Sequence, residues 1–162
     1  MKKVDLLLSD YAFYHQTTGN KLCHFIGIPL IILSLFALLR PLLIVRWFSA
    51  VEILILVSFL YYLMLDLRLA IVLLLAVSVL DAVAWKITDI RLAMAILIIG
   101  WIFQGIGHAL FEKRSPAFTR NLIHLMVGPL FLLNELLRIR PVQLPVVNSS
   151  GARASLPADL NP

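Results

Sequence analysis

Four histidines are the residues of this sequence best suited to chemistry. They are His15, His24, His108 and His124. Imidazole is the commonest metal ligand in proteins, and it suits iron, zinc, copper and nickel. Each histidine lies near one end of an apolar segment, and the order of these segments predicts that all four meet at one face of a membrane. The sequence therefore predicts a metal centre, although a single amphipathic histidine also favours a membrane interface without binding anything.

A second polar group surrounds the third histidine. Gln104, His108 and Glu112 follow one another at intervals of four, so they share one face of a helix. Gly105 and Gly107 allow another backbone or a ligand to approach that helix closely. Polar residues within an apolar span are costly and usually functional. Glu112 is therefore a candidate metal ligand, a candidate acceptor for a ligand's N–H group, or only a partner for the basic residues that follow it.

Two of the histidines share a local pattern. His24 and His124 each stand five positions before a proline and shortly after an asparagine that we expect to cap a helix, Asn20 and Asn121. Each proline leaves the carbonyl of the residue after the histidine without its helical donor. Such a carbonyl is a possible acceptor for an imidazole N–H group, which would fix the tautomer of the ring. The alternative is that a proline in the first turns of a span is simply tolerated.

The elements that must position these side chains are apolar helices. About 20 helical residues cross a bilayer, and the sequence holds five suitable segments. They run from about 21–39, 51–66, 69–85, 90–111 and 122–137. We expect a tight hairpin at Asp66 and Arg68 and a short interfacial helix over residues 3–18. The predicted fold is an all-α, polytopic transmembrane helical bundle of about five spans plus an N-terminal interfacial helix.

The alternation of the spans predicts which residues share a side of the membrane. Five crossings place the N-terminal segment, the connection 112–121 and all four histidines on one side. Asp81, Asn134 and Glu135 are then expected toward the other side, away from the histidines. Lys and Arg are divided equally between the two sides, so the charge distribution does not orient the bundle. Residues 1–140 form a single transmembrane catalytic domain in this interpretation, and residues 141–162 form a disordered tail.

Composition excludes several classes of protein. Apolar residues make up 61% of the chain and charged residues 14%, whereas soluble domains have about 45–50% and 25%. The formal charge of +5 comes from scattered Lys and Arg residues without a basic, aromatic-rich stripe, so no nucleic acid is expected as a partner. Cys23 is the single cysteine, which rules out a disulfide framework.

Two motifs resemble a known family. The first contains Tyr11, Tyr14, His15, Asn20, His24, Gly27 and Pro29, and the second runs from Trp101 through Gln104, Gly107, His108, Glu112 and Pro116 to Asn121 and Leu122. Over about residues 8–137 the chain is similar to the membrane family of 2-hydroxy fatty acid dioxygenases. The resemblance implies an Fe(II)-dependent dioxygenase that shortens a 2-hydroxy fatty acid by one carbon. His15, His24 and His108 match the family's histidines, while His124 stands where the yeast member has glutamine.

The layout of the sequence fits that chemistry. A long-chain 2-hydroxy fatty acid chelates Fe(II) through its carboxylate and its hydroxyl group, and O2 takes a remaining open position. The acyl chain is expected among the spans, in contact with membrane lipid. Lys113, Arg114 or Arg120 is then placed to hold the carboxylate by a charge-assisted pair. Glu112, Lys113 and Arg114 are therefore the predicted catalytic residues, and the four histidines are the predicted metal ligands.

Two other functions remain open from the residues alone. A His-cluster metal or small-molecule transporter predicts a polar path across the membrane, yet the first three spans offer few polar residues. A non-catalytic membrane protein predicts that the histidines are dispensable. The expected location is the inner membrane of a bacterium or the endoplasmic reticulum of a eukaryote. The sequence does not predict an oligomeric state.

Overall fold

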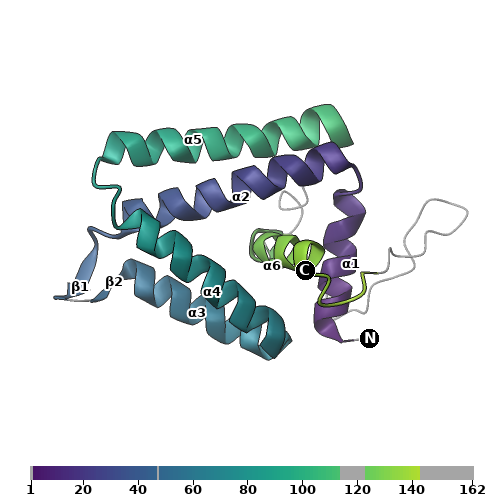
Figure 1. Cartoon of the computed structure of the whole chain (residues 1–162), viewed down its shortest axis with the longest axis horizontal. Helices are drawn as coiled ribbons and strands as arrows, with labels where there is room; N and C mark the ends of the chain where they lie inside the picture. The colour runs from purple at the N-terminus through teal and green to yellow at the C-terminus, as the bar shows by residue number, and fades with distance from the viewer. Residues whose placement is uncertain (1, 47, 114–122, 143–162) are drawn as a thin grey trace, which may run out of the picture.

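Helices make up most of the structure, a computed structural model that describes residues 2–46, 48–113 and 123–142. The elements, shown in Figure 1, are α1 (Lys3–Tyr14), α2 (Thr18–Leu39), β1 (Leu43–Val45), β2 (Phe48–Ser49), α3 (Ala50–Leu65), α4 (Leu67–Ala84), α5 (Ile90–Ile106), a π-helical segment (Gly107–Glu112) and α6 (Ile123–Leu137). The helical fold class is confirmed. The two short strands pair antiparallel where the sequence predicted only a connection. The predicted tail lies, beyond its first two residues, outside the described residues.

Three helices of the described chain are long and apolar enough to cross a membrane. They are α2, α4 and the continuous helix Ile90–Glu112 formed by α5 and the π-helical segment. α3 and α6 are apolar but shorter, with 16 and 15 residues. Large aliphatic side chains such as Leu56, Val57, Leu75 and Val79 are exposed on the outer surface. A soluble protein rarely exposes so much contiguous apolar surface, so these helices indicate a membrane protein.

Helices α2 and α5 lie side by side because glycines remove the side chains between them (Figure 1). A Cβ atom on Gly27 would lie 2.8 Å from the carbonyl oxygen of Gly100, and a Cβ atom on Gly100 would lie 3.0 Å from the carbonyl oxygen of Gly27. Such a contact requires glycine on both helices. The end of α5 is thereby placed against the start of α2, where two of the histidines are.

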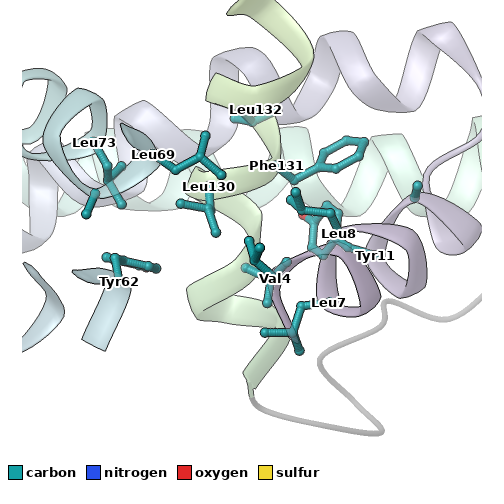
Figure 2. Packing of buried hydrophobic residues seen from close by; sticks show 13 residues of the cluster. Val4, Leu7, Leu8, Tyr11, Tyr62, Leu69, Leu73, Leu130, Phe131 and Leu132 are labelled. Carbon is teal, nitrogen blue, oxygen red and sulfur yellow. The ribbon is translucent and has the colours of Figure 1, made fainter. Parts of the chain in front are cut away.

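The predicted hairpin at Asp66 is confirmed. Asp66 ends α3 and caps α4, because its side chain accepts a hydrogen bond from the backbone N–H of Leu69 at 3.1 Å. The hairpin packs against α6 through the Tyr62 hydroxyl, which donates to the carbonyl of Met126 at 2.7 Å. Figure 2 shows the hydrophobic cluster in which these helices meet α1, with Leu8 and Phe131 fully buried. This cluster fixes α1, α6 and the hairpin around one end of the bundle.

Helix α6 does not carry its end to the far side of the bundle. Glu135, near its end, forms an ion pair with Lys21 at the start of α2. Arg140, just beyond it, contacts Asp5 of α1 and Asp66 of the hairpin, each at 2.7 Å. Figure 1 shows α6 nearly end-on and across the direction of α2. The prediction that Glu135 lies on the side away from the histidines is therefore wrong.

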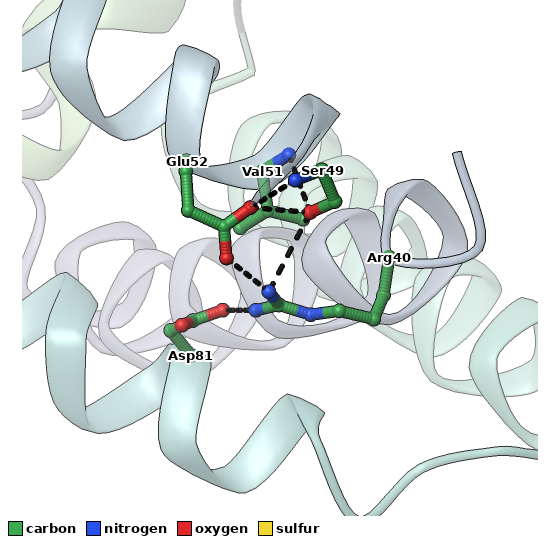
Figure 3. A network of polar contacts seen from close by, with 5 residues as sticks. All are labelled: Arg40, Ser49, Val51, Glu52 and Asp81. Carbon is green, nitrogen blue, oxygen red and sulfur yellow. Dashed lines mark hydrogen bonds and ion pairs between the residues drawn. The ribbon is translucent and has the colours of Figure 1, made fainter. Parts of the chain in front are cut away.

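A network of charges closes the opposite end of the bundle. The guanidinium of Arg40, at the end of α2, forms ion pairs with Glu52 of α3 and Asp81 of α4 (Figure 3). The indole ring of Trp85 covers the same guanidinium, with its centroid 4.3 Å away. Asp81 therefore makes the interhelical contact expected of an acidic residue within a span, and it lies far from the histidines.

Candidate metal centre

Three of the four histidines meet in a buried cluster. His15 lies between α1 and α2, His24 lies in the second turn of α2, and His108 lies in the π-helical segment. Each ring contributes a nitrogen, and these three nitrogens lie within 4.8 Å of one another. The side chains are only 2%, 3% and 4% exposed. A group of this kind can hold a metal ion.

Hydrogen bonds fix two of these rings in the same tautomer. His15 Nδ1 lies 2.7 Å from the carbonyl oxygen of Tyr11, and His24 Nδ1 lies 2.9 Å from that of Asn20. A carbonyl only accepts, so each Nδ1 carries the proton and each Nε2 presents a lone pair. These two Nε2 atoms face each other at 3.1 Å. Two facing lone pairs suit a shared cation, because ligand nitrogens about 2.1 Å from a metal and at right angles are about 3 Å apart.

The carbonyl that holds His24 is not the one predicted. The proline five positions on was expected to free the carbonyl of the residue after the histidine. The ring bonds instead to the carbonyl of Asn20, one turn earlier. His15 follows the same rule with Tyr11, also four residues back. Both rings therefore use the backbone of the preceding turn as their orienting acceptor, which is a usual support for a metal-binding histidine.

The carboxylate of Glu112 joins the end of α5 to the start of α2. Its Oε1 accepts hydrogen bonds from the backbone N–H and the hydroxyl of Thr17, at 2.7 and 3.0 Å. A negative charge stabilises the N-terminus of a helix, where backbone N–H groups are unpaired. Thr17, and not Asn20, is the N-cap of α2, and Asn20 is fully buried inside the helix. This link holds His24 and His108 at the same depth.

A local change of helix type places His108. The turn containing it is a π-helical segment, a feature that often occurs at functional sites. A Cβ atom on Gly107 would lie 2.4 Å from Asn20 Oδ1 and 3.0 Å from Cys23 Cβ, so this close approach needs glycine. Gly105, by contrast, faces open space. Lys113 ends the helix in a left-handed conformation with φ of 53°.

His124 lies beside the cluster and has a different partner. Its Nε2 lies 3.0 Å from Asp10 Oδ2, and its Nδ1 is buried without a hydrogen-bond partner among the described residues. The ring of Tyr11 separates it from the cluster. Tyr11 stacks on His15 with centroids 3.9 Å apart, while the centroid of His124 is 5.9 Å from that of Tyr11. The structure therefore brings three histidines together and places the fourth one ring away.

A cavity of about 490 Å³ extends from the histidines into the bundle. Small-molecule sites commonly have volumes of about 300–1,000 Å³. Its polar end is formed by Tyr11, Gln104 and the four histidines. Gln104 is buried there, and its Nε2 has no hydrogen-bond partner in the part of the chain that the structure describes. The rest of the lining, from α2, α3, α4, α5 and α6, is apolar except for Ser58, Tyr62 and the indole nitrogen of Trp101.

Burial keeps the ring of His15 uncharged. Removal from water is the main cause, and the neighbouring His24 the next, of a pKa of His15 lowered to about 2. A neutral imidazole is the form that binds a metal ion. His15 is therefore ready to act as a ligand at physiological pH.

Comparison with known proteins assigns this arrangement to a family. A model of the family described as "2-hydroxy-palmitic acid dioxygenase Mpo1-like" matches residues 1–139. The chain belongs to this family. It is 35% identical over 136 residues to the 2-hydroxy-palmitic acid dioxygenase MPO1 of Saccharomyces cerevisiae, covering 80% of this chain and 77% of the yeast protein. No solved structure matches the chain. The resemblance read from the two sequence motifs is thus confirmed, and the chain is a member of a dioxygenase, and hence oxidoreductase, family.

Two of the three predicted catalytic residues lie outside the lining of the cavity. Glu112 and Lys113 do not line it, and Lys113 is exposed to the surroundings. Arg114 lies outside the described residues. Asp10 and Thr17 are the contacts that sequence reasoning missed. Threonine is a preferred N-cap, so the sequence itself could have indicated that Thr17 begins a helix. Nothing in the sequence indicated that Asp10 contacts His124 of α6.

Proposed function

We propose that this chain is an Fe(II)-dependent dioxygenase that shortens long-chain 2-hydroxy fatty acids by one carbon at the three-histidine centre. The observation that carries the proposal is the position of three buried imidazoles at the polar end of a long apolar cavity. A 2-hydroxy fatty acid has the matching shape, with a chelating head group and an apolar chain. The name of the yeast relative points to the same class of substrate.

His15, His24 and His108 would hold the iron through one nitrogen each. Three protein ligands leave open positions for the substrate and for O2, as oxygen-activating sites require. Bound Fe(II) supplies the redox chemistry that makes O2 reactive beside carbon 2. In the balanced reaction the bond between carbons 1 and 2 breaks, carbon 1 leaves as CO2 and carbon 2 becomes the new carboxyl group. The four-electron reduction of O2 is completed with the release of one water molecule.

The residues around the histidines would hold and orient the head group. If Asp10 accepts a hydrogen bond from His124 Nε2, then His124 Nδ1 is left as a buried acceptor. That atom would accept a hydrogen bond from the 2-hydroxyl group, and Asp10 would keep the ring in the required tautomer. Gln104 Nε2 is the buried donor on the other side of the polar end, where it would bind a carboxylate oxygen. Participation of His124 as a fourth ligand, and of Lys113 and Arg114 in carboxylate binding, stays a prediction.

The site would lie at one face of a four-span bundle. Helices α2, α3, α4 and α5 would cross the membrane, since Asp66, Glu112 and the histidines lie at one end and the Arg40 network lies at the other. Helices α1 and α6 would lie across the end that carries the histidines. This arrangement lets an amphipathic substrate enter from the lipid with its polar head at the interface. The host membrane would be the bacterial inner membrane or the endoplasmic reticulum.

The direct test is consumption of O2 by purified, iron-loaded protein with 2-hydroxypalmitate. The fatty acid product should be one carbon shorter, and its amount should equal the O2 consumed. Palmitate lacks the second chelating group and should be inert, and 3-hydroxypalmitate should react poorly. No O2 consumption with 2-hydroxy acids of several lengths, together with a histidine-dependent metal flux in proteoliposomes, would favour a transporter instead.

A further inference from the structure

Beyond its polar end, the cavity presents an almost entirely apolar lining to a bound chain. The lining of α2 continues along one face through Ile28, Ile32, Leu35 and Phe36. The hydroxyl of Tyr62, which also lines the cavity, is already used, because it donates to a backbone carbonyl of α6. This arm of the cavity therefore selects its occupant mainly by shape and length.

The length of the arm can be read from the two helices that border it. His24 and Phe36 stand twelve residues apart on α2, a rise of roughly 18 Å. His108 and Leu97 stand eleven residues apart on α5, a rise of roughly 16 Å. Three bonds of extended polypeptide backbone cover ~3.6 Å. An extended acyl chain is taken to have the same geometry and therefore advances about 1.2 Å per bond. The arm thus accepts a chain of roughly fifteen bonds.

The arm ends at a packed apolar floor. Phe36 is 4% exposed, and it belongs to a buried cluster with Val51 of α3 and Ala84 of α4. Leu54 and Val77, which line the cavity from α3 and α4, pack against the same cluster. A chain that reaches this layer can go farther only if these side chains are displaced from a close-packed core, which is costly.

A second barrier stands one turn beyond the floor. Arg40 follows Phe36 by four residues on α2, and its ion pairs with Glu52 and Asp81 hold α2, α3 and α4 together (Figure 3). Spreading these helices to admit a longer chain would separate partly buried charges from their partners, which is strongly unfavourable. The floor is therefore rigid on its far side.

We propose that Phe36, backed by Leu54 and Val77, is the stop that sets the length of the fatty acyl chain at roughly sixteen carbons. The proposal rests on the proposed function for the identity of the occupant, an acyl chain whose head lies at the histidines. Phe36 touches the terminal methyl group in this arrangement and is a specificity-determining residue. It has no part in the chemistry at carbon 2.

Binding of 2-hydroxy acids of fourteen to twenty carbons tests the stop without any turnover. The full-length protein in nanodiscs is kept free of O2, and each acid displaces a fluorescent fatty acid. Wild-type affinity should rise about fourfold per added methylene until about sixteen carbons and then cease to rise. Phe36→Ala should move that limit outward by about two carbons or more because the floor is opened. Phe36→Trp should move it inward.

A pair of leucines on α3 supplies the matched control. Leu54→Ala opens the floor and should extend the accepted length, whereas Leu56→Ala, at an exposed position on the same helix, should leave the profile unchanged. Phe36→Met preserves more of the core and replaces Phe36→Ala if that variant does not fold. Folded floor variants with the wild-type length limit would overturn the proposal. A sharp limit in a protein that consumes no O2 would leave the stop intact and refute the proposed function.

Discussion

The Nε2 atom of His15 faces the Nε2 atom of His24 at 3.1 Å, while the Nδ1 atom of each ring is held by a backbone carbonyl. Both Nε2 atoms therefore present lone pairs toward the same buried point. Such an arrangement is unfavourable without a cation or a proton between the rings, because burial strengthens their mutual repulsion. The local backbone of two helices thus builds a site that could hold a positive ion.

Loss of one ligand should empty the site. His15→Ala, His24→Ala and His108→Ala should each reduce bound iron from about one ion per chain to a small fraction of that, measured by elemental analysis. A chelator should lower the unfolding temperature of the wild type but not of these variants, since bound metal stabilises the folded state by about 2.7 kcal/mol at a concentration 100 times its Kd. Full metal occupancy in the triple variant would contradict the site.

His124 and Asp10 should behave as one unit in activity. His124→Ala removes the proposed hydrogen-bond acceptor for the substrate hydroxyl group, and Asp10→Asn removes the carboxylate that orients it. Each should lower kcat by about 10-fold or more, as expected for the loss of a buried hydrogen-bond partner, and the double variant should be little worse than either single variant. Both proteins should keep their iron because His124 lies outside the three-histidine group. Loss of iron in His124→Ala would instead identify His124 as a fourth ligand.

The helices were predictable because their signals are local. The segments expected at 21–39, 51–66, 69–85 and 90–111 match α2, α3, α4 and the continuous helix Ile90–Glu112 within three residues at each end. The direction of α6 was not predictable in the same way. Counting spans assumes that every apolar segment crosses, and helix length does not distinguish α6, with 15 residues, from α3, with 16. The ion pairs of Lys21 and Arg140 then decide where the end of α6 lies.

The site also has some features that follow from local sequence and others that depend on tertiary contacts. The depth of the histidines predicted that all four would meet, and the structure brings His15, His24 and His108 together with His124 beside them. The acceptors of His15 and His24 are local backbone carbonyls, whereas the contacts that bring the helices of His24 and His108 together are tertiary and were not visible in the sequence. Glu112 caps a helix that begins 95 residues earlier, at Thr17. The spacing in the sequence places Glu112 on the same helix face as His108. Only the packing of α2 against α5 shows that the Glu112 carboxylate caps the start of α2.

Gly107 should be far less tolerant of substitution than its neighbour Gly105. Gly107→Ala places a Cβ atom 2.4 Å from Asn20 Oδ1, and such overpacking typically costs about 1–3 kcal/mol. It should also displace His108 and weaken metal binding. Gly105→Ala meets nothing within 4 Å and should be neutral or stabilising by up to about 1 kcal/mol, because alanine favours a helix. Thermal unfolding and iron content of the two variants test this contrast, which would fail if both behaved alike.

The contacts of Arg140 should make stability depend on pH in the acid range. The Arg140 guanidinium is the main cause that holds the pKa of Asp5 below its ordinary value of 3.8. Burial acts to raise the pKa of Asp66, but the backbone N–H of Leu69 and the same guanidinium bring it below 3.8. The folded protein therefore binds fewer protons than the unfolded chain, and the stabilisation is complete above about pH 4. It is lost as the pH falls through the lowered pKa values of the folded state.

Arg140→Met tests this link between the end of α6, α1 and the hairpin. At neutral pH the variant should be less stable than the wild type by about 2–3 kcal/mol, the usual range for hydrogen bonds between charged groups. The difference should shrink as the pH falls below about 4 and both carboxylates are protonated, so the two unfolding curves should converge. Arg91→Met, at an exposed position at the start of α5, is the matched control and should stay parallel to the wild type. If Arg140→Met is as stable as the wild type at pH 7, or if its deficit persists at low pH, these ion pairs do not hold α6 in place.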